Sequence, residues 1–269
     1  MKNKKLSHNG LQGSVTSVMA ALLCILIGLF VGFLVLLAIN PSHAWADGFV
    51  RILKGGFHDA PYGVGKELAN AAPLIMTGLS VGFAFKTGLF NIGAAGQYTL
   101  GAYGALYCAI MLKLPWFVCL LAAAILGGLW GAIPGFFKAY FNINEVITSI
   151  MFNWIGLYLV NELVYQNGTG PMYDVRNTRT LNLGKNADLA QSVIPDFGLN
   201  KLFQTNSTTI AIFLAAVVAI LIWVVLNKTT FGYELKAVGL NKSAARYAGI
   251  NEKKNIILSM AIAGALAGF

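Results

Sequence analysis

A chain of 269 residues that is 57% hydrophobic and only 11% charged is too apolar for a soluble domain, in which about a quarter of residues are charged. The net charge of +9 would fit a nucleic-acid binder, but the basic residues are spread over segments that flank apolar stretches and form no single patch. The composition therefore predicts an all-α, polytopic membrane protein and excludes nucleic acid as a partner.

About seven apolar stretches are predicted to span the bilayer. A hydrocarbon core about 30 Å thick needs about 20 helical residues, and residues 15–39 contain 25 without a charge. The predicted spans are Val15–Ile39, Ala69–Phe85, Leu89–Leu112, Trp116–Phe137, Val146–Tyr165, Thr208–Asn227 and Asn255–Phe269. Because the last has only 15 residues, we expect residues 1–269 to form one transmembrane domain that is incomplete at its C-terminus.

The charges on the connecting segments predict the orientation. The N-terminus and segments 86–88, 138–145 and 228–254 share one side and carry eleven basic and three acidic residues, whereas the other side carries eight basic and seven acidic. Basic residues in short loops mark the cytoplasmic side. We therefore expect a multi-pass protein of the cell membrane with a cytoplasmic N-terminus.

Two long segments are then extracytoplasmic. Segment 40–68 contains a short, weakly amphipathic stretch around Phe49–Phe57, and segment 166–207 is polar with little helical pattern. Connections of this length are usually functional or disordered. Both segments are expected to contribute surface for an extracytoplasmic partner, although a solvated connector explains 166–207 equally well.

A glycine-rich segment, 87–104, places amides at membrane depth. Its glycines disfavour a uniform helix, so we predict a discontinuous helix there. Asn91 and Gln97 are expected to line a substrate pathway, because polar groups inside a membrane are costly and irregular backbone survives only against protein or a watery cavity. The alternative is tight packing with Gln97 as an interhelical hydrogen-bonding group.

The fifth predicted span carries a polar stripe. Glu145, Ser149 and Asn153 recur at helical spacing and should face the protein interior. Glu145 lies in the first turn, where the helix dipole favours a carboxylate. Asn153 lies deeper, and it either faces a pathway or makes a structural interhelical hydrogen bond.

The fourth predicted span should pack closely through its glycines. Gly127, Gly131 and Gly135 are spaced by four residues and lie on one helical face, which lets a neighbouring backbone approach. Pro134 is expected to kink or end this helix near its cytoplasmic end.

The cytoplasmic segment 228–254 contains a short predicted helix. Asn241 is a suitable N-cap for residues 242–248, and Gly249 is a suitable terminator. The helix either docks a partner or belongs to a solvated basic loop that only fixes the topology.

Three motifs then resemble a known family. Residues 231–250, with Phe231-Gly232, Lys236-Ala237-Val238-Gly239 and Ala244-Ala245-Arg246-Tyr247-Ala248-Gly249-Ile250, resemble the coupling-helix region of ABC importer permeases of the ribose and branched-chain amino acid superfamily. Residues 88–97 and 144–153 resemble its nucleoside, or simple sugar, branch. One departure is Ser243, which stands where many relatives carry Glu.

The resemblance implies a permease subunit of an ATP-driven importer, for nucleosides or alternatively for a monosaccharide or branched-chain amino acid. It also implies a bacterial plasma membrane, a second permease subunit, an ATP-binding subunit and a substrate-binding lipoprotein. An ion-coupled secondary transporter is less favoured. Contact with the ATPase would involve Asn241, Lys242, Ser243, Ala244, Ala245, Arg246, Tyr247 and Gly249.

No enzymatic chemistry is expected in this chain. No span carries a nucleophile–base pair or a metal-ligand cluster, and no G-x-x-x-x-G-K-[ST] phosphate loop is present. We therefore predict no catalytic residue, no metal and no cofactor, with ATP hydrolysed by a separate protein.

Overall fold

The computed structural model describes residues 3–168, 170–174, 176, 179–183 and 187–269, with side chains described from Val18 on. Lys2, one of the eleven basic residues on the side predicted to be cytoplasmic, lies outside the described residues. The chain divides into two units, residues 1–64 and 65–269, which are taken separately. Helices dominate both units, and the only strands among the described residues form one short antiparallel pair.

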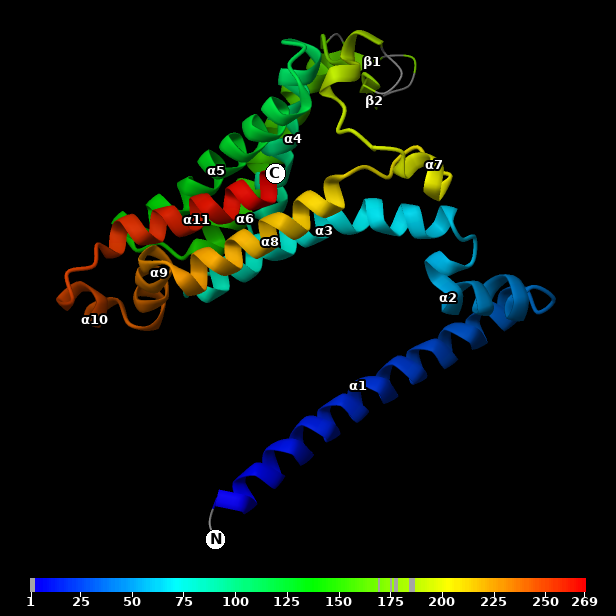
Figure 1. Cartoon of the computed structure of the whole chain (residues 1–269), viewed down its shortest axis with the longest axis horizontal. Coiled ribbons are helices and arrows are strands. Elements are labelled where there is room, and N and C mark those ends of the chain that lie inside the picture. Colours follow the sequence, from blue (N-terminus) through cyan, green and yellow to red (C-terminus); the bar gives the residue numbers. More distant parts are fainter. Residues whose placement is uncertain (1–2, 169, 175, 177–178, 184–186) are drawn as a thin grey trace. The chain divides into compact units, whose positions relative to one another are not determined.

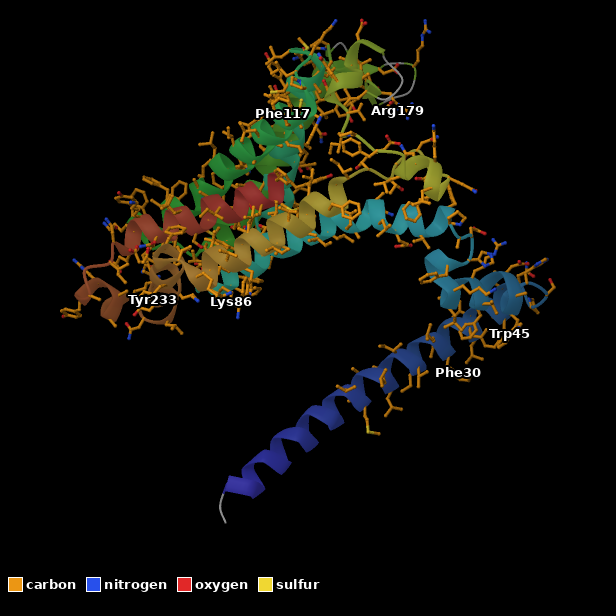
Figure 2. The ribbon with its side chains drawn as sticks, viewed as in Figure 1. Phe30, Trp45, Lys86, Phe117, Arg179 and Tyr233 are labelled. Carbon is orange, nitrogen blue, oxygen red and sulfur yellow. The ribbon has the colours of Figure 1, made fainter. Side chains whose placement is uncertain are left out.

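The first unit is a long apolar helix followed by short helical turns. Helix α1, Asn3–Ile39, contains a candidate span at Val18–Ile39, close to the predicted Val15–Ile39. A π-helical turn at Ala44–Phe49, helix α2 at Val50–Lys54 and a 3-10 turn at Gly55–Phe57 follow it. Most side chains of α1 from Val18 on are exposed, as that of Phe30 is in Figure 2.

The second unit is a helical bundle (Figure 1). Its long helices are α3 (Tyr62–Lys86, beginning in the first unit), α4 (Ala94–Ile110), α5 (Trp116–Phe141), α6 (Glu145–Tyr165), α8 (Ala211–Lys228) and α11 (Glu252–Gly268). Between α6 and α8 lie 3-10 turns at Gln166–Gly168 and Ala187–Ser192, strands β1 (Tyr173–Asp174) and β2 (Arg179–Thr180), and helix α7 (Leu199–Phe203). Helices α9 (Thr230–Leu240) and α10 (Lys242–Tyr247) join α8 to α11.

Five of these helices are long and apolar enough to cross a membrane: the end of α1, then α3, α5, α6 and α8. The chain is therefore a polytopic membrane protein. The two other predicted spans correspond to α4 and α11, each of 17 residues. Helix α4 begins at Ala94 and not at the predicted Leu89, because residues 87–93 leave the helical conformation.

Helix α5 continues beyond its predicted end. It runs through the buried Pro134 to Phe141, and Asn142 terminates it in the left-handed conformation with φ of 53°. Of the two outcomes expected at Pro134, an end of the helix is therefore ruled out, and α5 extends four residues past the predicted span. A proline removes one backbone hydrogen bond, but packing against neighbouring helices allows it inside membrane helices.

Glycines hold α5 against α11, as the sequence predicted for the face that carries Gly127 and Gly131. A Cβ on Gly264 would lie 2.3 Å from the carbonyl oxygen of Gly127, and one on Gly131 would lie 2.5 Å from that of Met260. Figure 1 shows α11 lying along α5. The backbones touch directly, so a side chain at these positions would separate the two helices.

Candidate functional site

The chain breaks from helical geometry between α3 and α4, within the segment predicted to be discontinuous. Gly88 has φ of +73°, and a Cβ there would lie 2.5 Å from the Cα of Gly239 in α9. Only glycine meets both demands without strain. The break therefore lies at residues 87–93, while α4 itself is continuous, and the break touches helix α9.

Two amides from this region pair with each other. Asn91 Nδ2 donates to Gln97 Oε1 at 2.8 Å, and Gln97 Nε2 donates to Asn91 Oδ1 at 3.0 Å. Asn91 Nδ2 also donates to the hydroxyl of Ser80 in α3, at 3.0 Å. All three side chains are buried. The amides are thus hydrogen-bonded to protein, and a role for them in a pathway stays a prediction.

A double-mutant cycle measures this pair. Asn91→Leu or Gln97→Leu alone leaves the other buried amide without its partner, and each should lower the free energy of unfolding by about 1–2 kcal/mol. The double variant should lose less than the sum of the two single losses. The measurement is unfolding of the purified protein in detergent. Additive losses would show that the amides do not depend on each other.

Asn153 of α6 binds the start of α4. Its Oδ1 accepts from the backbone N–H of Gly96 at 2.8 Å, and its Nδ2 donates to the carbonyl of Ile92 at 3.0 Å. The first N–H groups of a helix lack intrahelical partners, so one side chain here serves both the helix start and the break before it. The structure thus gives Asn153 an interhelical hydrogen-bonding role, and pathway exposure is still only predicted.

If the chain is the permease that the resemblance implies, Asn153→Leu should impair transport and leave substrate binding by the implied lipoprotein unchanged. The variant leaves the Gly96 N–H and the Ile92 carbonyl without these partners, which should also cost about 1–3 kcal/mol of stability. Uptake and thermal unfolding are measured together, with Asn153→Gln as the control that keeps an amide. Full uptake by Asn153→Leu would contradict a role in the pathway and would leave Asn153 a tolerated member of a packed interface.

The other two polar residues of the α6 stripe differ from each other. Ser149 is fully buried, and its hydroxyl has no hydrogen-bond partner among the described residues. A Cβ on Gly93 would lie 3.3 Å from the Cβ of Ser149, so this hydroxyl adjoins the amide pair. Glu145 lies at the helix start, where its carboxylate pairs with Lys138 at 2.9 Å. Of the three polar residues on this face of α6, Ser149 is thus the one whose side chain has no hydrogen-bond partner among the described residues.

Segment 228–254, predicted to be cytoplasmic, contains the predicted capped helix. Asn241 Oδ1 accepts from the N–H of Ala244 at 3.1 Å, and α10 follows. The N–H of Gly249 donates to Arg246 and that of Ile250 to Ala245, each at 3.0 Å, with φ of +81° at Gly249. This is a Schellman termination. The N-cap and the glycine stop are confirmed, whereas α9 before them was not predicted.

The side chains of this segment face two ways. Ala245 is buried in one core cluster with Leu235 and Val238 of α9. In contrast, Tyr247 is 95% exposed and Leu240 is 89% exposed. A docking surface here would use these two side chains and the exposed residues around them, while Ala245 fixes α10 to α9. Sequence reasoning missed Leu240, and its only signal was an apolar residue directly before the cap.

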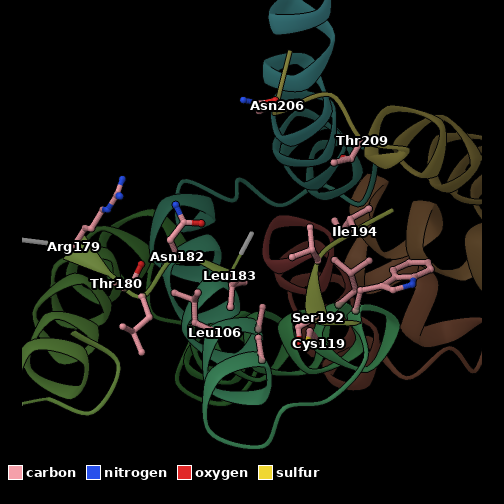
Figure 3. Close-up of a pocket in the computed structure, with 16 residues that line it drawn as sticks. Leu106, Cys119, Arg179, Thr180, Asn182, Leu183, Ser192, Ile194, Asn206 and Thr209 are labelled. Carbon is pink, nitrogen blue, oxygen red and sulfur yellow. The ribbon is translucent and has the colours of Figure 1, made fainter. Parts of the chain in front are cut away.

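The segment between α6 and α8 packs on the α4–α5 turn. Ser192 Oγ donates to the carbonyl of Leu114 at 2.6 Å, the Gln191 amide donates to the carbonyl of Lys113, and Thr208 Oγ1 donates to Gly65 at 3.0 Å. A cavity of about 600 Å³ lies beneath it, lined by apolar residues of α4 and α5 and by polar residues of the segment. Figure 3 shows Cys119 beside Ser192, with Arg179 and Thr209 on opposite sides.

These features define a class: an integral membrane protein in which two short helices, α9 and α10, lie against a break between membrane helices. The chain belongs to the family of branched-chain amino acid transport system permease components, which matches residues 65–269. It is thus a permease of the ABC importer type. Such a subunit is not itself catalytic, and it implies an ATP-binding subunit as partner.

Individual relatives are similar over most of this chain. The guanosine ABC transporter permease protein of Bacillus subtilis is 34% identical, covering 98% of this chain and 71% of its own length. The nucleoside ABC transporter permease protein of Lactococcus lactis is 32% identical over 93% of this chain and 68% of its own. The glucose ABC transporter permease protein of Haloferax volcanii is 34% identical, with 91% and 64% covered. No solved structure matches.

Proposed function

We propose that this permease imports nucleosides. The observation that carries the proposal is the 34% identity with a guanosine permease across 98% of the chain, supported by the nucleoside permease at 32%. A monosaccharide is the second candidate, because a glucose permease is also 34% identical. A branched-chain amino acid, which the family description names, is less favoured.

The contacts suggest how ATP hydrolysis is coupled to transport. Residues 228–254 form the coupling segment, and closure of the ATPase pair pushes on α10 through Lys242, Ser243, Ala244, Arg246 and Tyr247. Because Ala245 packs on α9 and Gly239 of α9 touches the break at Gly88, the push reaches the α3–α4 break. The proposed pathway side chains are Asn91, Gln97, Ser149 and Asn153, which lie at or beside the start of α4, and Glu145, one helical turn before Ser149 on α6.

The proposed assembly places residues 1–269 in one transmembrane domain with a cytoplasmic N-terminus and seven spans. Helices α4 and α11 would be about 25 Å long and close to the bilayer thickness. Two permease subunits would pair with two ATP-binding subunits. Segment 187–207 on the opposite side would meet a substrate-binding lipoprotein, because Gln191 and Ser192 fix it by hydrogen bonds to the turn between α4 and α5.

Competition for uptake tests the substrate. Proteoliposomes holding the complete complex are given radiolabelled guanosine together with unlabelled inosine, glucose or leucine. We expect ATP-dependent guanosine uptake that inosine suppresses and that glucose and leucine leave unchanged. Uptake of labelled glucose in place of guanosine would reject the nucleoside assignment in favour of the monosaccharide.

A further inference from the structure

The short helical segment after α1, residues 44–57, has two chemically distinct faces. One face is charged. The carboxylate of Asp47 lies 2.7 Å from His43 Nδ1, four residues before it, and 3.7 Å from the guanidinium of Arg51, four residues after it. The hydrogen bond with His43 lowers the pKa of Asp47, which keeps the carboxylate ionised. Lys54 extends the charged face by one more turn.

The other face is aromatic and aliphatic. The rings of Trp45 and Phe49 stack with centroids 5.7 Å apart, and Ile52 and Leu53 continue the face. Trp45 is 62% exposed and Phe57 is 78% exposed, and Ile52 and Leu53 are more than half exposed. Figure 2 shows Trp45 at this turn. The described residues of the first unit leave most of this apolar face exposed.

Contacts with α1 fix the depth of this face. The ring of Phe33 lies 5.7 Å from that of Trp45 and 5.0 Å from that of Phe49, measured between centroids. Phe33 belongs to the candidate span and precedes its end at Ile39 by six residues, or about 9 Å of helix. If α1 crosses the bilayer, the aromatic side chains that touch Phe33 lie inside its outermost layer.

We propose that residues 44–57 form a membrane-interface anchor that binds phospholipid. The apolar face enters the outer part of the acyl-chain layer, and Arg51 and Lys54 face the headgroup phosphates. Trp at the interface and basic residues opposite an apolar face are the properties of helices that lie in this layer. This assigns the segment to lipid, where the sequence alone suggested a partner protein, and it is independent of the transported substrate.

Site-directed spin labelling tests the anchor. Arg51→Cys and Leu53→Cys are made singly in a chain whose Cys24, Cys108 and Cys119 are replaced by Ala, because positions two apart face nearly opposite ways. The complete complex is reconstituted in vesicles of phosphatidylethanolamine and phosphatidylglycerol. Collisions of each nitroxide with oxygen, which concentrates in lipid, are compared with collisions with a water-soluble nickel chelate.

We expect oxygen to dominate at position 53 and the nickel chelate to dominate at position 51. Dominance of nickel at both positions would place the segment in water and overturn the proposal. Shielding of both positions from both reagents would overturn it also, because protein would then cover the segment. If the cysteine-free chain does not assemble, a photoreactive phospholipid is crosslinked to the native chain. Lipid adducts on α1 without any on residues 44–57 would again reject the anchor.

Discussion

Gly264→Leu should prevent stable folding of the bundle. A Cβ at this position already lies 2.3 Å from the Gly127 carbonyl oxygen and 2.9 Å from the Cα of Gly131, and both are backbone atoms that no rotamer change can move. Overpacking typically costs about 1–3 kcal/mol, and a rigid backbone contact belongs at the upper end or beyond. We expect a large fall in the thermal midpoint and loss of the monodisperse protein in detergent.

Gly78→Leu is the matched control, because a Cβ on Gly78 of α3 meets nothing within 4 Å. The same change of residue type should therefore leave the thermal midpoint unchanged or slightly raised, since leucine is the better helix former. Equal effects of the two substitutions would contradict the close α5–α11 contact.

Tyr247→Asp should abolish co-purification of the ATP-binding subunit while the permease still inserts into the membrane. An almost fully exposed aromatic side chain on a capped helix fits a binding hot spot, which is worth about 2 kcal/mol or roughly a thirtyfold change in affinity. Because the side chain makes little contact with its own chain, the permease itself should keep its thermal midpoint.

Tyr247→Phe keeps the ring and should retain the ATPase. Ala245→Glu separates docking from internal packing, because Ala245 is buried against α9, and this variant should also lower the thermal midpoint. Normal association of the Tyr247→Asp variant with the ATPase would show that α10 is no docking site and belongs to a loop that only fixes the topology.

The sequence located the membrane helices well because length and hydropathy decide them. Five of the seven predicted spans match candidate spans, and α1 ends at the predicted Ile39. The start of α4 was misplaced, because the break at 87–93 depends on the tertiary approach of Gly88 to Gly239. Helix α9 was missed because its three buried residues, Gly232, Leu235 and Val238, mark only one narrow face of a short segment.

In the candidate site, the sequence predicted contacts between neighbouring residues better than contacts between residues on different helices. The cap at Asn241 and the stop at Gly249 involve neighbouring residues, and the structure contains both. The pairing of Asn91 with Gln97 and the bonds from Asn153 to the start of α4 join residues that helix packing brings together. A sequence shows that such amides are buried, but their partners follow only from the packed backbone. The burial of Ala245 against α9 could not be predicted for the same reason.

The most direct test of the account is ATP hydrolysis by the reconstituted complex, measured with and without guanosine and the binding protein. We expect guanosine with its binding protein to stimulate hydrolysis, and only when this permease is present. Exchange of Tyr247 for Asp should remove the stimulation. A hydrolysis rate that guanosine does not change, together with guanosine uptake that follows an ion gradient without ATP, would contradict the assignment as the permease of an ATP-driven nucleoside importer.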